Sequence, residues 1–283
     1  VGGGFHLTLG VAWADYDNDG DQDLYLANDT DQNILYRNNG DATFTNTNNA
    51  DQRSHTGDIR GGMGITWGDY DNDEDLDLFV TNWLDENNVL YRNNGDGTFT
   101  DVSAQSKVFE SGLGKTCWGT EFFDYDNDSD LDLYIVCGHI DPPSWEMPGG
   151  QEDIFLENNG DGTFTDISVT SGMDLSFSSM GLAAGDYDNN GYLDIYVTNL
   201  DWGNGLMRNN GDGTFTDVAD ELGLLVNLIS WGTNFIDYDN DGLIDIYVVA
   251  SCISGTGNDG TLGCSWNGGQ SDVLPTNNVL FKN

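Results

Sequence analysis

The sequence of 283 residues predicts an all-β fold, a β-propeller of about five four-stranded blades that stands alone or forms part of a larger ring. Three observations lead to this prediction. An acidic segment of nine residues occurs five times, and its copies start 51 to 62 residues apart. A second segment, rich in Asn and Gly, alternates with the first. Short apolar runs flank both segments, so each unit holds four strands, which is typical of propeller blades.

The two segments define the repeat. The acidic segments are Asp15–Asp23, Asp69–Asp77, Asp124–Asp132, Asp186–Asp194 and Asp237–Asp245. The Asn- and Gly-rich segments are Tyr36–Phe44, Tyr91–Phe99, Leu156–Phe164 and Met207–Phe215, and a fifth starts at Phe281. Together they divide a single domain, residues 1–283, into units of approximately 1–46, 47–101, 102–166, 167–217 and 218–283, of which the last is incomplete.

Each unit is predicted to form two β-hairpins. The acidic segment lies between apolar stretches such as Val11–Ala14 and Leu24–Ala27. These stretches are rich in β-branched or aromatic residues, and their length suits a buried strand better than a helix. The second segment reads as a turn between two further strands. The only helical candidates are short pieces such as Ala219–Leu225, so the pattern argues against a parallel α/β sheet.

A glycine and an aromatic residue recur at fixed places in the unit. The glycine stands five residues before each acidic segment and predicts a β-bulge or close packing where blades converge. These glycines are Gly10, Gly64, Gly119, Gly181 and Gly232. The aromatic residue follows each segment and is predicted to pack between blades, with stacking on a ligand as the alternative. These residues are Tyr25, Phe79, Tyr134, Tyr196 and Tyr247.

The composition limits the classes of partner. The chain has 49 acidic and 8 basic residues and a formal net charge of -41, which argues against binding nucleic acid or anionic membranes. Disorder is the first reading of so much charge. However, 37% of the residues are hydrophobic and 12% are aromatic, which is enough to bury a core. No apolar run is long enough to span a bilayer.

The acidic segment has the pattern of a cation-binding loop. Oxygen ligands at positions 1, 3, 5, 7 and 9 suit Ca²⁺, which takes about six to eight oxygens at loosely constrained angles. Position 4 is always Asn, a residue that tolerates the left-handed backbone of a tight loop. Position 6 is Gly in three copies, whereas Glu74 and Ser129 predict more strained or weaker loops. Magnesium and a merely solvated acidic surface are the alternatives.

The prediction is about five calcium ions, one per repeat. Position 7 varies among the copies, which predicts that its backbone carbonyl is the ligand. The predicted ligands are Asp15, Asp17, Asp19, Asp21 and Asp23; Asp69, Asp71, Asp73, Asp75 and Asp77; Asp124, Asp126, Asp128, Asp130 and Asp132; Asp186, Asp188, Asn190, Tyr192 and Asp194; and Asp237, Asp239, Asp241, Leu243 and Asp245.

The acidic loop, the apolar strand after it and the Asn-Gly-Asp-Gly-Thr-Phe segment together resemble the VCBS/FG-GAP repeat, which also builds the propeller of integrin alpha subunits. The resemblance covers nearly the whole chain. It implies a β-propeller with a Ca²⁺ in each blade, held in the loop between two strands. It also implies an extracellular adhesion, lectin-like or structural module, although some members of the family are carbohydrate-active enzymes.

The four cysteines predict two disulfides. Cys117 and Cys137 flank the third acidic loop, on strands that should pair with the two residues nearly opposite each other. Cys252 and Cys264 bracket a Gly-rich insertion. Two disulfides indicate an oxidising, extracellular compartment, and four buried free thiols are the alternative. Glycosylation sequons stand at Asn28 and Asn127.

No catalytic constellation is visible, and the three histidines His6, His55 and His139 stand in no metal or nucleophile motif. The sequence therefore predicts a non-catalytic, secreted or cell-surface module for adhesion or structural assembly, with a protein or glycan partner. The incomplete last unit leaves an open strand edge that would allow a homo-oligomer or filament. The alternatives are a polysaccharide-degrading enzyme and a carbohydrate-binding module. The latter would use Trp83, Trp145, Trp202 or Trp266.

One basic position also recurs in the second segment. Arg37, Arg92, Arg208 and Lys282 occupy it, and they are predicted to pair with nearby Asp side chains rather than to bind an anion.

Overall fold

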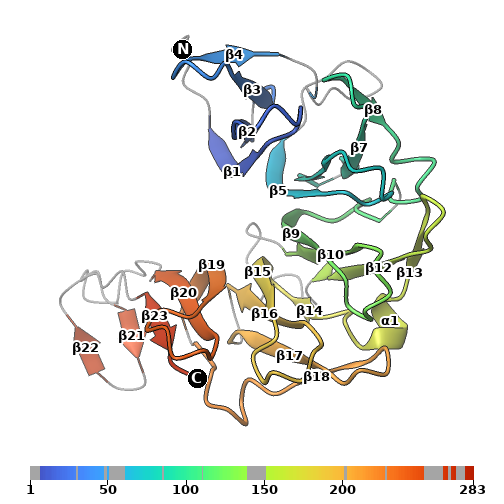
Figure 1. Ribbon diagram of the computed structural model, residues 1–283. Coiled ribbons are helices and arrows are strands. Elements are labelled where there is room, and N and C mark those ends of the chain that lie inside the picture. The colour runs from blue at the N-terminus through green and yellow to red at the C-terminus, as the bar shows by residue number, and fades with distance from the viewer. Residues whose placement is uncertain are drawn as a thin grey trace.

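The computed structural model describes residues 7–29, 31–47, 50, 61–84, 86–109, 111–138, 151–200, 203–226, 228–251, 264–266, 269–271 and 278–283. Within these ranges the chain forms five antiparallel sheets, which follow one another around a common centre as the blades of a propeller (Figure 1). The first strands of consecutive blades contact one another in order. The arc is open between the first and the last blade (Figure 1).

Four blades have four strands each. The first holds β1 (Thr8–Ala14), β2 (Asp23–Asn28), β3 (Ile34–Asn38) and β4 (Phe44–Asn46), and the second β5 (Gly62–Gly68), β6 (Asp77–Asn82), β7 (Val89–Asn93) and β8 (Phe99–Asp101). The third holds β9 (Cys117–Phe123), β10 (Asp132–Cys137), β12 (Ile154–Asn158) and β13 (Phe164–Asp166), and the fourth β15 (Ser179–Gly185), β16 (Asp194–Asn199), β17 (Gly205–Asn209) and β18 (Phe215–Asp217).

The fifth blade shows three strands within the described residues, β19 (Ile229–Ile236), β20 (Asp245–Ser251) and β23 (Val279–Phe281). Two small ribbons lie outside the blades, β11 (Gln151–Glu152) with β14 (Ser176–Phe177) and β21 (Cys264–Trp266) with β22 (Gly269–Ser271). The all-β propeller of five blades is therefore confirmed.

The short helical pieces differ from one blade to the next. After the third blade the chain forms α1 (Ser168–Ser171), which Gly172 ends in a left-handed conformation. The candidate Ala219–Leu225 occupies the corresponding place after the fourth blade, but it is a series of turns rather than a helix. Gly223, at φ 71°, ends these turns before a helix can develop.

The repeated aromatic residue fills the space between blades, as predicted. Four of these side chains are fully buried, and each packs against the following blade: Tyr25, Phe79, Tyr134 and Tyr196. The ring of Tyr25 lies 6.2 Å from that of Trp67 in an edge-to-face arrangement. These aromatic contacts make the interface between blades the main apolar core of the protein.

The repeated glycine allows the first strands of neighbouring blades to approach closely. A Cβ atom on Gly64 would lie 1.9 Å from the carbonyl oxygen of Trp118, and one on Gly10 would lie 2.3 Å from that of Met63. Each first strand also has a register irregularity near its glycine. Both predicted reasons for the glycine, a bulge and close packing, are thus present. At Gly232, in the last blade, a Cβ atom would meet no described atom within 4 Å.

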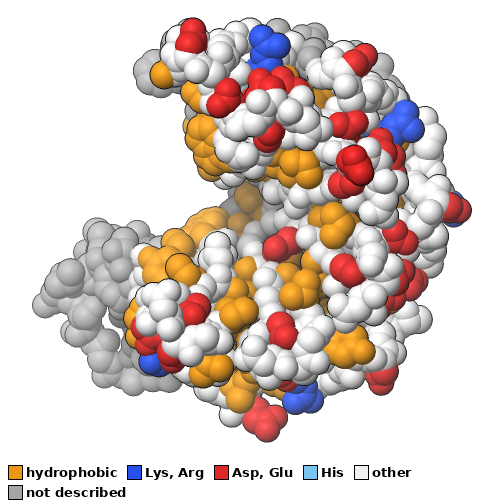
Figure 2. Space-filling view, viewed as in Figure 1, with side chains coloured by type: hydrophobic (Ala, Val, Ile, Leu, Met, Phe, Trp, Pro, Cys, Tyr) orange, Lys and Arg blue, Asp and Glu red, His pale blue; other side chains and the backbone are white. Residues whose placement is uncertain are grey.

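The two ends of the arc expose faces that are buried elsewhere. Tyr247 is 37% exposed, although its four counterparts are fully buried. In the first blade, Trp13 is 55% exposed, although Trp67 at the same place packs against the blade before it. Figure 2 shows hydrophobic side chains on the parts of both end blades that border the opening. The last blade thus presents one half of an inter-blade contact, and the first blade presents the other half.

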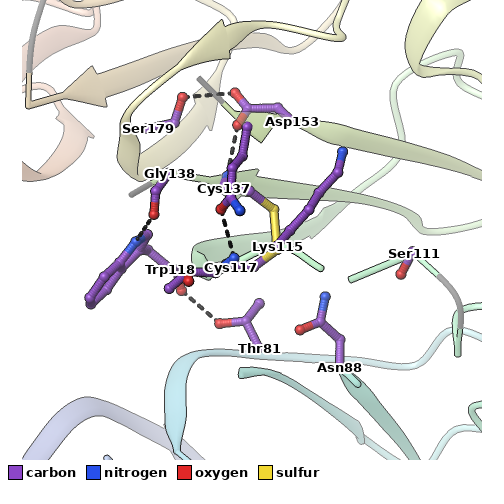
Figure 3. Close-up of a disulfide and its surroundings, with 12 residues drawn as sticks. Thr81, Asn88, Ser111, Lys115, Cys117, Trp118, Cys137, Gly138, Asp153 and Ser179 are labelled. Carbon is purple, nitrogen blue, oxygen red and sulfur yellow. Dashed lines mark hydrogen bonds between the residues drawn. A yellow bond between two sulfur atoms is a disulfide. The ribbon is translucent and has the colours of Figure 1, made fainter. Parts of the chain in front are cut away.

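A disulfide between Cys117 and Cys137 joins β9 to β10, as predicted (Figure 3). It lies at the register where, in the first blade, the Thr8 hydroxyl donates a hydrogen bond to the Asn28 side chain. Beside it, the buried Asp153 carboxylate accepts hydrogen bonds from the Cys137 backbone N–H and the Ser179 hydroxyl. The second predicted disulfide cannot be placed, because Cys252 lies outside the described residues and only the backbone of Cys264 is described.

Gly64→Ala should lower the free energy of unfolding by about 1–3 kcal/mol, because its Cβ atom has no room beside the Trp118 carbonyl. Gly232→Ala is the matched control, since it makes the same change at the open end, and there we expect a change within about 0.5 kcal/mol. Chemical denaturation of both variants measures the difference. Equal losses would contradict close approach as the reason for the glycine.

Candidate metal centre

The acidic loops, numbered from position 1 to position 9, connect the first strand of each blade to the second. The position 4 residues all have the predicted left-handed backbone conformation, with φ between 56° and 66°. They are Asn18, Asn72, Asn127, Asn189 and Asn240. Position 6 is also left-handed in every loop. Glu74 (φ 73°) and Ser129 (φ 76°) adopt this conformation without being glycine, so the predicted strain of these two loops is present.

Backbone N–H groups inside the loop hold the Asp side chains in place. In the second blade, Asp69 accepts hydrogen bonds from the N–H groups of Asp73 (3.0 Å) and Glu74 (2.9 Å), one on each carboxylate oxygen. Asp73 in turn accepts one from the N–H of Asp75 (3.0 Å). The same pattern recurs in the other loops. The conformation of the loop backbone is therefore stabilised by the carboxylates of the same loop.

The position 9 carboxylate ties the loop to the third strand. In the second blade, Asp77 is fully buried and accepts hydrogen bonds from the N–H groups of Tyr70 (3.1 Å) and Asn93 (2.8 Å). The Asn93 side chain then donates to the backbone carbonyl of Tyr16 in the blade before, at 2.7 Å. The third, fourth and fifth blades repeat this connection. One buried Asp thus links its loop, its blade and the preceding blade.

The structure brings together a subset of the predicted ligands. In four loops, carboxylate oxygens of positions 1, 3 and 9 lie within 4.8 Å of one another, and in the first loop those of positions 1, 3 and 5 do. The groups are Asp15, Asp17 and Asp19; Asp69, Asp71 and Asp77; Asp124, Asp126 and Asp132; Asp186, Asp188 and Asp194; and Asp237, Asp239 and Asp245. The side chains at position 7 do not belong to these groups.

The groups have the properties of a hard-cation site. Oxygen Oδ1 of Asp17 and of Asp71 is buried without a hydrogen-bond partner, although a buried carboxylate oxygen is normally satisfied. Burial also raises the pKa of the position 9 carboxyls, to about 6 for Asp23, about 8 for Asp77 and Asp132 and about 7 for Asp194. Carboxylates held together in this way fit a divalent cation that prefers oxygen ligands.

Adjacent loops are hydrogen-bonded to one another through position 4. The Asn18 side chain donates to Asp75 of the next loop at 2.9 Å, and Asn72 donates to Asp130 at 2.7 Å. Asn127 donates to the Gly191 carbonyl at 3.1 Å. Reasoning from the sequence attributes this Asn to the loop backbone alone. Its presence in every copy is the one signal that could have indicated a second role.

The recurring basic position lies beside the carboxylate groups. Lys282 pairs with Asp239, and its Nζ atom lies 3.3 Å from Asp241, as the sequence predicts. The third blade has Glu157 at this place, and Glu157 accepts a hydrogen bond from the Tyr125 hydroxyl at 3.2 Å. Reasoning from the sequence missed Glu157, although alignment of the repeated segments places it opposite the basic residues.

The two sequon residues have different surroundings. Asn28 is fully buried, and its side-chain nitrogen donates to the Gln32 carbonyl at 2.6 Å. A glycan on Asn28 would require this side chain to leave the fold. Asn127 lies in the exposed third loop, where its side-chain nitrogen is bonded to the next loop.

Several residues of the carbohydrate and catalytic alternatives lie beyond the described ranges, namely Trp145, Trp202, His6, His55 and His139, and only the backbone of Trp266 is described. Trp83 is 38% exposed, and its ring stands edge-to-face with that of Trp118, at 5.9 Å. In the part of the chain that the structure covers, no helix has the length and apolar character to cross a membrane.

Comparison with known proteins gives a family match. A family model described as an FG-GAP-like repeat matches residues 15–80, 73–135, 148–197 and 186–248, which together make up more than half of the chain. Cartilage acidic protein 1 of Xenopus tropicalis is 24% identical over 264 residues, which are 85% of this chain and 39% of that protein. The chain therefore spans well under half of this curated relative.

Solved structures are similar at the level of the fold. BBS1N in complex with ARL6DN is 11% identical with a TM-score of 0.51, over 87% of this chain and 65% of that one. An Agrocybe aegerita lectin, described as recognising non-reducing terminal N-acetylglucosamine, is 20% identical with a TM-score of 0.48, over 85% of this chain and 61% of that one. At these identities the similarity concerns the fold alone.

Asn72→Ala should destabilise the protein by about 0.5–1.5 kcal/mol more than Asn240→Ala does. Both changes place alanine in a left-handed backbone, but Asn72 also loses its hydrogen bond to Asp130 in the next blade. Asn240 stands in the last described blade and makes the backbone cost measurable on its own. Urea unfolding of the two variants gives the difference, and identical losses would mean that the bond between loops contributes nothing.

Proposed function

Because the chain belongs to the FG-GAP-like repeat family, we propose that it is a non-catalytic, extracellular, calcium-binding β-propeller that serves adhesion or structural assembly. The observation that carries the proposal is the carboxylate group that recurs in all five blades, with positions 1, 3 and 9 in four of them and positions 1, 3 and 5 in the first. The disulfide supports the extracellular location, since such bonds persist in oxidising compartments. The curated relative is named for cartilage and for its acidity.

The loop residues would hold Ca²⁺ as a structural ion. The carboxylates at positions 1, 3 and 9 would bind it together with position 5 and the backbone carbonyl of position 7. Calcium, when bound, supplies positive charge to the carboxylates and a partner to the unpaired oxygens of Asp17 and Asp71. About five such ions would offset part of the formal charge of -41. The chain's own N–H groups orient the carboxylates before the ion arrives.

The faces at the two ends of the arc support the assembly role. Tyr247 occupies the place of Tyr25, and Trp13 occupies the place of Trp67, so the exposed pair matches the buried pair inside the protein. Docking of the first blade of one copy on the last blade of another would reproduce this buried contact. Such a head-to-tail contact is heterologous, so it builds a closed ring or a filament.

Carbohydrate binding is the second candidate function, and the exposed Trp83 ring favours it, because aromatic faces stack on sugars. Loss of glycan-array binding in Trp83→Ala would support this candidate, and a wild-type protein that binds no glycan would contradict it.

Removal of calcium should lower the melting temperature, because an ion bound only by the folded state adds RT ln(1 + [L]/Kd) of stability per site. Asp69→Ala should lower the melting temperature in Ca²⁺ more than Glu221→Ala, a control that removes an exposed acid outside the loops. Differential scanning calorimetry in Ca²⁺ and in EDTA measures both effects. A metal-free sample that melts at the same temperature as the calcium-loaded one would refute the calcium assignment.

The 283-residue chain should associate reversibly as its concentration rises, and Trp13→Asp should shift it to the monomer by placing a charge on the end face. Val169→Asp, at an exposed site on α1, is the control and should leave association unchanged. Multi-angle light scattering across a range of concentrations measures the mass. A wild-type chain that stays monomeric throughout would contradict docking between copies.

A further inference from the structure

One position in each blade places a side chain beside the acidic loop from the third strand. It directly precedes the Asn whose N–H bonds to the position 9 carboxylate. Its residues, which we call the gate position, are Arg37, Arg92, Glu157, Arg208 and Lys282. The third strand and the hydrogen bond to the position 9 carboxylate recur in all five blades, whereas the charge at the gate position differs.

In the fifth blade the gate position provides a cation to the loop. The Lys282 ammonium pairs with Asp239, a member of the carboxylate group, and lies 3.3 Å from Asp241. A lysine ammonium is charged at neutral pH. An ion entering this loop has to displace a positive charge that already satisfies two of its carboxylates.

In the third blade the gate position adds negative charge. Glu157 accepts a hydrogen bond from the Tyr125 hydroxyl at 3.2 Å, and Tyr125 is position 2 of the loop. Glu157 therefore adds a negative charge beside this loop, whereas the corresponding residue of the other four blades adds a positive one.

The arginine blades lie between these two cases. Arg92 lines the same surface hollow as Asp71, a member of the second carboxylate group, so its guanidinium compensates part of the charge of that loop. An arginine placed in this way reduces the attraction for a cation.

On the basis of the proposed calcium function, we infer that the gate position tunes the calcium affinity of its own blade. Glu157 strengthens the third site, whereas Lys282 weakens the fifth and takes the place of the metal when calcium is absent. At low calcium concentration, the carboxylates of the fifth loop consequently remain paired with the Lys282 ammonium.

The test is a calcium titration of the 283-residue chain by isothermal calorimetry, with two gate variants and two charge-matched controls. Lys282→Gln should tighten one site by roughly 3- to 10-fold, and Glu157→Gln should weaken one site by a similar factor. Lys115→Gln removes a lysine that pairs with Glu152 away from the loops, and Glu221→Gln removes an exposed acid. Both controls should leave every affinity within about twofold of the wild type.

Thermal melting separates tuning from a general structural role. Lys282→Gln should lower the melting temperature in EDTA, because Asp239 and Asp241 lose their counter-charge, and the loss should shrink in saturating Ca²⁺. Equal losses in both conditions, or affinities that match those of the controls, would overturn the inference while leaving calcium binding intact. A wild-type chain that binds no calcium would overturn both the inference and the proposed function.

Discussion

The buried carboxylate at position 9 is the contact on which each blade depends. In the second blade it belongs to Asp77, which accepts hydrogen bonds from the start of its own loop and from Asn93 on the third strand. Asn93 extends the connection to the Tyr16 carbonyl of the preceding blade. A charge that is out of water must be compensated by hydrogen bonds or by a counter-charge, so this carboxylate constrains all the groups around it. The hydrogen bonds of this carboxylate and of Asn93 therefore connect the loop, the third strand and the preceding blade.

The same carboxylate explains why so acidic a chain can fold around its loops. Position 9 contributes a buried acid in every blade, and positions 1 and 3 bring further oxygens to within 4.8 Å of it in four of them. The backbone N–H groups compensate part of this charge. However, one carboxylate oxygen of Asp17 and one of Asp71 are buried without a hydrogen-bond partner. The remaining requirement is for positive charge, and the fifth blade shows a protein side chain, Lys282, meeting it locally.

The sequence predicts most of the fold, because a repeat states the same strand, loop and turn five times. It also predicts the Cys117–Cys137 disulfide and the acidic loops in which the carboxylate groups lie, since these depend on the sequence and pairing within a single blade. Contacts between blades are harder to predict, because they depend on how two sheets are placed in space. The bond from Asn72 to Asp130 and the exposure of Tyr247 belong to this class. The sequon at Asn28 likewise does not indicate that the side chain is buried, where it donates a hydrogen bond to the Gln32 carbonyl.

The repeated glycine of one blade lies against a backbone carbonyl of the blade that follows it in the sequence. Gly64 lies against the Trp118 carbonyl, and Gly181 lies against the Trp231 carbonyl. Consecutive blades therefore contact each other in one direction along the chain. A gene that duplicates or loses one unit would preserve all the remaining contacts, because each blade touches only its neighbours. Blade number in such a protein can change over evolution in single steps, without a new interface having to arise first.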